Sequence, residues 1–411
     1  MQYFTFIGMG DKENGYREVY YSFEDDPKQA VLSRFVQELI IKRHEKDLSE
    51  VYIFATKESR ERYEKDLNAL FDKKVALNFI NISKDITYED YTLELLKYMK
   101  ENEDIVLDIT HSFRYIPIKL LFALKYIELT KNVHIQHLYY GLLKKEDVGE
   151  VVDFVSDYMM QQISDLLAQF NRTLMINVED IDVLIAQKDD KIKNFLKSLS
   201  TFNKMIEYCE FDSSLKEIRK ITESCSSIEK NKDRYSLIIP IVKQIKDKFK
   251  FYSECKNDVE KKEELIRVLI NHHRMQVAIT FIDQFFREEL IRNTLEPLNN
   301  KFDLEIYLKN KKMPSNGSTT FYRISQFLKT DVYKLVNGKT YFQYEELLDG
   351  KENEVKQIKN ILTTKQKDTI DKFFNEIRNH MNHGTSIQTE IEPILYDMLD
   401  CIRLIGRRDK R

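Results

Sequence analysis

Short apolar runs alternate with amphipathic stretches along the first 155 residues of the chain. Apolar runs bounded by polar residues predict buried strands, and apolar positions that recur every three or four residues predict helices. The predicted strands cover residues 3–7, 51–55, 75–80, 105–108 and 133–140, and a return strand covers 149–155. The predicted helices cover residues 27–46, 88–100 and 116–130, and a further charged helix ends at residue 70. This alternation predicts an α/β domain with a parallel sheet and right-handed crossovers.

The pattern changes after residue 156, where strand signals almost vanish and helical periodicity dominates. Helices are expected at residues 159–174, 190–208 and 237–251, at 263–295 as one straight or kinked helix, and again between 352 and 406. Residues 301–350 contain proline, glycines and many aromatic residues, which predicts an irregular insertion with some strand content. We therefore expect an α/β domain at residues 1–155, a helical connector region at 156–260, and an all-α domain at 261–411 that carries the insertion.

Composition supports a mainly helical, globular chain. The 411 residues suffice for two or three domains, 42% of them are apolar, and only 10 are Gly and 6 are Pro. Lys and Arg number 65 against 68 Asp and Glu, so the net charge is −3 and no global basic field attracts nucleic acid. A nucleic-acid substrate must then be held by a local patch or only transiently, and we expect no stable DNA partner.

The four cysteines are widely scattered and lack zinc-binding spacing, so the sequence predicts no metal site and a reduced, cytoplasmic setting. The N-terminal residues are typical of a strand and not of a signal peptide. No apolar run approaches the length that spans a bilayer, so no membrane association is expected.

Polar residues follow the predicted strand at 105–108, at the point where a helical pattern is about to begin. They are Asp108, Thr110, His111 and Ser112. Ligands of open α/β sheets bind at the carboxyl edge, where hydroxyl groups, loop N–H groups and a helix N-terminus can hold phosphate oxygens. The alternative is a local role, in which Thr110 or Ser112 caps the next helix and Asp108 bonds to nearby backbone. Both roles can hold at once.

Gly8, Met9 and Gly10 follow the first predicted strand and favour the ligand interpretation, because glycines let a ligand approach the backbone. The dinucleotide fingerprint is incomplete, since position 13 is Glu, and no Walker lysine motif is present. A dinucleotide cofactor and an NTP-driven activity are therefore disfavoured.

A second cluster, Arg378, Asn379 and His383, lies at the end of an amphipathic helical pattern, just before Gly384. Arginine can hold a phosphate, and histidine can move a proton near neutral pH. Metal-free RNA cleavage, in which the ribose 2′-hydroxyl attacks its own phosphodiester, needs both functions. An Arg and a His at this spacing arise by chance about once in such a chain. A second match, Arg267 to His272, does lie within an apolar helical pattern.

Together the two clusters resemble a known family. The segment Asp108-Ile109-Thr110-His111-Ser112 is similar to the D-x-T-H-G signature of CRISPR-associated proteins of type III systems. These proteins join an N-terminal CARF domain, a Rossmann-like sensor of cyclic oligoadenylate, to a C-terminal helical HEPN ribonuclease. Arg378-Asn379-x-x-x-His383 resembles the HEPN motif. Ser112 stands where the signature has Gly, but it keeps an N–H and adds a hydroxyl, so we expect the loop to survive with altered ligand approach.

The resemblance implies roles for particular residues. Cyclic oligoadenylate, with cyclic tetraadenylate the expected ring, would be bound as an allosteric activator by Gly8, Met9, Gly10, Thr110, His111, Ser112 and Arg114. Asp108 would give structural support to the loop. Arg378, Asn379 and His383 would be catalytic, with no cofactor and no metal. Such proteins act as homodimers, in which a two-fold ring matches an isologous interface and two HEPN motifs share one active site.

The resemblance thus predicts a cyclic-oligoadenylate-activated, metal-independent endoribonuclease that cleaves single-stranded RNA in antiviral defence and leaves a 2′,3′-cyclic phosphate. Two alternatives remain open. The chain could be a cyclic-nucleotide sensor without nuclease activity, or a ring nuclease that degrades its activator with help from Thr110 or Ser112. A dehydrogenase is the weakest alternative, because the dinucleotide fingerprint is missing.

Overall fold

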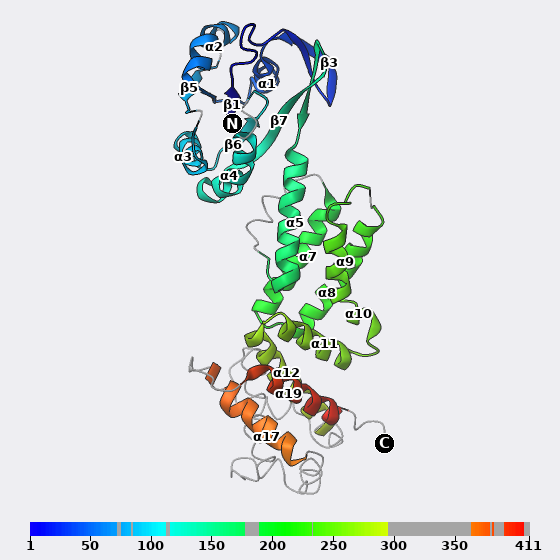
Figure 1. The fold of residues 1–411 in the computed structure, drawn as a ribbon. Coiled ribbons are helices and arrows are strands. Elements are labelled where there is room, and N and C mark those ends of the chain that lie inside the picture. The colour runs from blue at the N-terminus through cyan, green and yellow to red at the C-terminus, as the bar shows by residue number, and fades with distance from the viewer. Residues whose placement is uncertain are drawn as a thin grey trace, which may run out of the picture. The chain divides into compact units, whose positions relative to one another are not determined.

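The computed structural model describes residues 1–71, 75–83, 85–111, 116–176, 189–231, 233–294, 363–378, 380–381 and 390–406. Several predicted features lie outside these residues, namely Ser112, Arg114, Asn379, His383 and the insertion at 301–350. The chain divides into two compact units, Met1–Gln162 and Ile163–Arg411 (Figure 1). The three predicted segments with their boundaries stay a prediction.

The N-terminal unit contains an eight-stranded sheet in the order β3-β2-β8-β7-β6-β1-β4-β5. The strands are β1 (Gln2–Ile7), β2 (Val19–Phe23), β3 (Asp26–Ser33), β4 (Glu50–Ala55), β5 (Leu77–Asn81), β6 (Asp104–Asp108), β7 (His134–Lys145) and β8 (Val148–Asp153). The five strands β7, β6, β1, β4 and β5 run parallel to one another. In contrast, β8 is antiparallel to β7, and β3 is antiparallel to β2. The predicted parallel sheet is thus the central part of a mixed sheet.

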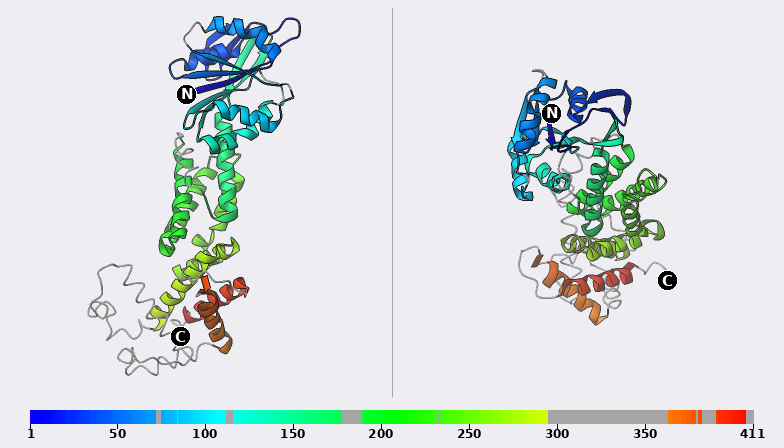
Figure 2. Two further views of the ribbon diagram at one scale, coloured as in Figure 1. Left: turned by 90° about the vertical axis from the view of Figure 1, so that its left-hand side faces the viewer. Right: turned by 45° about the horizontal axis from the view of Figure 1, so that its top comes forward.

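Helices cover both faces of this sheet (Figures 1 and 2). They are α1 (Val36–His44), α2 (Lys57–Leu70), α3 (Tyr88–Tyr98) and α4 (Ile116–Lys131). Alternate residues of β1 enter two separate cores: Tyr3 packs with α1 and α2, and Phe4 packs with α3 and α4. Because β1 is covered on both faces, its sequence is a continuous apolar run and not an alternating one.

The predicted helix at residues 27–46 is wrong over its first part, since residues 26–33 form β3 and only Val36–His44 are helical. The edge strand β3 pairs with β2 through Tyr20 with Leu32 and Tyr21 with Val31, and the sequence pattern did not predict β2. Pro27 lacks an N–H group and is tolerated at a sheet edge. Cross-strand pairing has therefore overridden the helical spacing of the apolar residues.

The described parts of the C-terminal unit are helical. α5 (Val155–Thr173) begins in the first unit and continues into the second. It is followed by α7 (Asp190–Glu207), α8 (Phe211–Glu229), α9 (Ile239–Lys248), α10 (Phe251–Glu254), α11 (Asp258–Asn271), α12 (Met275–Thr294), α17 (Thr364–Lys372), the π-helix η2 (Phe373–Arg378) and α19 (Ile391–Gly406). Their core is rich in buried phenylalanine, and α12 packs against both α11 and α19. Several helices begin at side-chain caps, such as Asn257 before α11 and Thr363 before α17.

The predicted long helix at residues 263–295 is two helices. α11 ends at Asn271, and α12 begins at Met275. His273 between them has φ of 56°, and the N–H of Arg274 reaches back to the carbonyl of Leu269 at 2.9 Å. This left-handed residue stops the helix and lets the chain change direction, although the apolar periodicity continues across the break.

Candidate functional site

The candidate ligand site lies at the carboxyl edge of the sheet, where β1 is hydrogen-bonded between β4 and β6. The glycine loop, which we define as residues 8–15, follows β1, and Thr110 and His111 follow β6. A Cβ atom added to Gly8 would lie 3.5 Å from the carbonyl oxygen of His111. The structure therefore brings together two segments that are separated by about a hundred residues and that the sequence marked independently.

Asp108 fixes the start of the loop after β6. Its buried carboxylate accepts hydrogen bonds from the hydroxyl of Thr5 at 2.6 Å and from the hydroxyl of Tyr3 at 3.2 Å. The other carboxylate oxygen accepts from the N–H and the hydroxyl of Thr110, at 2.9 and 2.5 Å. Burial raises the pKa of Asp108, although these donors oppose the shift. The donors compensate the burial of a carboxylate and tie β1 to the end of β6.

The hydroxyl of Thr110 is engaged within the protein. It donates to Asp108 and accepts a hydrogen bond from the N–H of Gly141 on β7 at 2.8 Å. A Cβ atom at Gly141 would lie 2.8 Å from the Cγ2 atom of Thr110, so the absence of a side chain there permits this contact. A ligand that meets Thr110 in this arrangement meets its backbone more readily than its hydroxyl.

His111 contributes a neutral ring to the site. Burial lowers the pKa of His111 to about 4, and its Nε2 atom is buried without a hydrogen-bond partner. The ring packs on Tyr16, with the ring centroids 4.3 Å apart. Since the imidazole is uncharged at neutral pH, His111 could contact a base or a sugar but supplies no positive charge for a phosphate.

Tyr16 is a site residue that the sequence pattern did not reveal. Its hydroxyl accepts a hydrogen bond from the N–H of Gly8 at 3.1 Å, and its ring contacts His111, Phe35 and Tyr63. Tyr16 thereby joins the glycine loop to His111 in the loop that follows β6. No periodicity or spacing in the sequence distinguishes it from the other tyrosines.

The second candidate site centres on Arg378, the last residue of η2. Its Nε atom donates to Asp283 of α12 at 3.1 Å, and the two side chains are 21% and 8% exposed. Phe373, Phe374 and Ile377 bury the other face of η2, as the apolar stripe predicts. Asn379 and His383 lie outside the described residues. Sequence reasoning missed Asp283.

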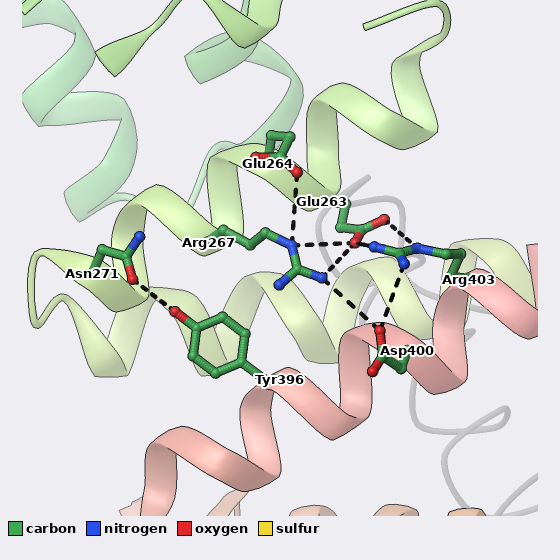
Figure 3. A network of polar contacts seen from close by, with 7 residues as sticks. All are labelled: Glu263, Glu264, Arg267, Asn271, Tyr396, Asp400 and Arg403. Atoms are coloured by element: carbon green, nitrogen blue, oxygen red, sulfur yellow. Dashed lines mark hydrogen bonds and ion pairs between the residues drawn. The ribbon is translucent and has the colours of Figure 1, made fainter. Parts of the chain in front are cut away.

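The second Arg–His match lies in a different environment. Arg267 of α11 contacts the carboxylates of Glu263, Glu264 and Asp400, at 2.7, 3.7 and 4.0 Å (Figure 3). Arg403 of α19 also pairs with Glu263, so this network joins α11 to α19. His272 bonds through Nε2 to Lys248, and its pKa is lowered by burial and by that neighbouring charge. These contacts give the second match a structural role.

No group of three or more His, Cys, Asp and Glu residues in the described part of the chain could hold a metal ion. No helix among those described is both long enough and apolar enough to cross a membrane.

Comparisons with known proteins bear on the N-terminal unit. Residues 3–145 match the family model of the CARF domain of CRISPR system endoribonuclease Csx1. CRISPR-associated protein MJ1674 of Methanocaldococcus jannaschii is 30% identical over 141 residues, which make up 33% of this chain and 22% of that relative. The chain thus matches only about a fifth of the length of this curated relative, and the family match ends before the helical unit. The N-terminal unit is similar to the CARF domain of a CRISPR-associated protein.

Proposed function

We propose that the N-terminal unit senses cyclic oligoadenylate in type III CRISPR antiviral defence. The observation that carries this proposal is the match of residues 3–145 to a CARF model, on a unit whose glycine loop and Thr110–His111 segment meet at one sheet edge. That edge of an open α/β sheet is where ligands bind. Cyclic tetraadenylate is the expected ring, and Ser112 and Arg114 complete the proposed set of contacts.

The helical unit is then a HEPN endoribonuclease that cleaves single-stranded RNA without a metal ion. His383 moves the proton of the 2′-hydroxyl, Arg378 stabilises the negative charge on the phosphorane, and Asn379 supports their geometry. The support is the sequence motif together with the placement of Arg378 at the end of η2, where its guanidinium is partly exposed and bonded to Asp283. Asp283 would orient Arg378 in the manner of a positioning residue.

The active form is a homodimer in this proposal. A cyclic oligoadenylate with two-fold symmetry fits a symmetric pocket shared by two copies, and the catalytic motifs of two copies form one active site. Ring binding favours one conformation of the dimer and thereby shifts its population.

The test is cleavage of single-stranded RNA by purified protein, measured in parallel with cyclic tri-, tetra- and hexaadenylate. We expect activity with one ring, no inhibition by EDTA, and products that end in 2′,3′-cyclic phosphate. Arg378→Ala and His383→Ala should each abolish cleavage and leave ring binding intact. The matched control is Arg219→Ala, whose side chain is 68% exposed.

Three results would count against the proposal. Near-wild-type cleavage by His383→Ala contradicts the catalytic assignment, and strict metal dependence contradicts the 2′-hydroxyl mechanism. Ring binding without any RNA cleavage would leave a sensor that signals to a partner.

A further inference from the structure

We infer that Arg62 of α2 is a positioning residue of the ligand site: it holds the backbone carbonyl groups of the glycine loop and so leaves N–H groups of that loop for phosphate oxygens. The inference rests on the proposed function, because it names how the same site recognises the phosphodiester groups of its ligand. Arginine beside a phosphate-binding site commonly contacts the phosphate directly, and the role inferred for Arg62 differs from that one.

The guanidinium of Arg62 donates its hydrogen bonds to carbonyl oxygens. Its Nη1 and Nη2 atoms donate hydrogen bonds of 3.1 to 3.4 Å to the carbonyl groups of Met9, Asp11, Lys12 and Glu13. The hydroxyl of Tyr63, the next residue of α2, donates to the carbonyl of Met9 at 2.8 Å. Most of the negative ends of the peptide groups in this loop are therefore drawn toward α2 and kept away from an anionic ligand.

The N–H groups of the loop divide into two sets. Asp11 and Gly15 exchange backbone bonds at 3.1 and 2.9 Å, and the Asp11 carboxylate accepts from the N–H groups of Glu13 and Asn14. The N–H groups of Met9, Gly10 and Lys12 have no hydrogen-bond partner in the described structure, and Gly10 and Lys12 are exposed. Gly10 has φ of 65°, the left-handed conformation that lets successive N–H groups form a concave anion site.

Gly15 makes this arrangement sterically possible. A Cβ atom at Gly15 would lie 2.4 Å from the hydroxyl oxygen of Tyr63 and 3.0 Å from Nη2 of Arg62. Its φ of 69° also favours glycine. Tyr63 is only 2% exposed and anchors this turn of α2 in the core, so Arg62 extends from a fixed position.

The experiment measures affinity for cyclic tetraadenylate, together with the tri- and hexaadenylate rings, in wild-type protein and in Arg62→Met. We expect the variant to bind roughly 10- to 100-fold more weakly, because the loop loses the donor that orders its carbonyl groups. Arg60→Met is the matched control, since Arg60 lies on the same helix and pairs with Glu64 outside the loop. Arg60→Met should bind like the wild type.

Two further readouts separate positioning from direct contact. A direct contact between a basic side chain and a phosphate adds to the slope of log K against log salt concentration, because mobile ions screen the attraction. A positioning arginine leaves that slope unchanged in Arg62→Met, and Arg62→Lys does not restore affinity, because one ammonium group cannot reach four carbonyl groups. A flatter slope, or rescue by lysine, would show that Arg62 binds phosphate and would overturn the inference.

Two further affinity results distinguish failure of the inference from failure of the proposed function. Wild-type affinity in Arg62→Met would overturn the inference and leave the proposed function standing. If wild-type protein binds none of the three rings, the proposed function fails and the inference fails with it. Circular dichroism melting curves verify that each variant is folded, and Arg62→Lys, which keeps the charge and most of the side chain, provides the comparison if Arg62→Met does not fold.

Discussion

Hydrogen bonds inside the protein leave the Thr110 side chain little to offer a ligand. Its hydroxyl is shared between the Asp108 carboxylate and the Gly141 N–H, and its methyl group fills the space over Gly141. The residue therefore sets the shape of the loop after β6 and presents backbone to the candidate ligand site.

Gly141→Ala tests this packing. The new Cβ atom would lie 2.8 Å from Cγ2 of Thr110, so the threonine must move and we expect a loss of about 1–3 kcal/mol in the free energy of unfolding. Adding Thr110→Ser removes Cγ2 and keeps the hydroxyl, so the double variant should recover most of that loss. Urea denaturation of the two single variants and the double variant gives the interaction free energy between residues 110 and 141. Additive effects would contradict the proposed clash.

His111→Phe separates packing from ligand contact. The unfolded-state pKa of histidine is about 6.5, and burial lowers the folded-state pKa of His111 to about 4. The unfolded chain then binds more protons between these values, so stability is fully present above the higher pKa and falls as pH drops toward the lower one. The variant keeps an aromatic ring against Tyr16. Its free energy of unfolding should depend less on pH, because unfolding takes up as much as one proton fewer than in the wild type.

Chemical denaturation between pH 4.5 and 7.5 checks this expectation. His44, whose pKa burial also lowers to about 4, keeps part of the pH dependence in every variant. An unchanged pH dependence in His111→Phe would show that the buried ring does not titrate as described. Loss of cyclic tetraadenylate binding with unchanged stability in His111→Phe would show that His111 contacts the ligand.

At the scale of elements, the sequence was informative where an element is decided by its own residues. The buried strands β1, β4 and β6 are continuous apolar runs, and each lies within a residue or two of its predicted range. The edge strand β3 was mistaken for helix because its conformation depends on pairing with β2. The sequence allows a kink between residues 263 and 295 but does not locate the break between α11 and α12, because one left-handed residue, His273, interrupts a periodicity that continues on both sides.

The π-helix η2 supports a further prediction at this scale. The turn ends in Arg378 and directs its Nε atom to Asp283, which is 8% exposed. Asp283→Asn removes the charge and should lower the RNA cleavage rate about tenfold, because a displaced guanidinium stabilises the transition state less well. Asp212→Asn, at an exposed aspartate paired with Lys262, is the control. Cleavage at the wild-type rate in Asp283→Asn would remove Asp283 from the site.

For the whole molecule, α5 is the element that both units share, since it begins at Val155 and the first unit ends at Gln162. Its first turns are tied to α4 through Glu128, which accepts hydrogen bonds from Tyr158 at 2.5 Å and Gln162 at 2.7 Å. The segment that follows β6 at the ligand site leads into α4. No pattern in the sequence indicates this connection, because a buried carboxylate on an apolar helix is recognised only from its partners.

Glu128 should make the link between α4 and α5 depend on pH. Burial raises the pKa of Glu128 to about 7, whereas an unfolded chain has a glutamate pKa of about 4.3. The folded protein therefore binds the extra proton in this interval, and the contribution to stability is present below the lower value and lost as pH rises through the higher one. Glu128→Gln cannot ionise, so its free energy of unfolding should exceed that of the wild type at pH 8 and approach it at pH 4, below the lower value.

The same residue tests whether the link carries a signal. Glu128→Leu replaces the carboxylate, which accepts both hydrogen bonds, with an apolar side chain of similar size. The helices α4 and α5 then remain packed without the two hydrogen bonds. If ring binding at the sheet edge acts on the helical unit through α4 and α5, Glu128→Leu should bind cyclic tetraadenylate normally and show a several-fold weaker activation of RNA cleavage, while Glu128→Gln stays close to the wild type. Equal activation in both variants would mean that these bonds stabilise the first unit and transmit nothing, because a coupling between two sites requires contacts that differ between the two states.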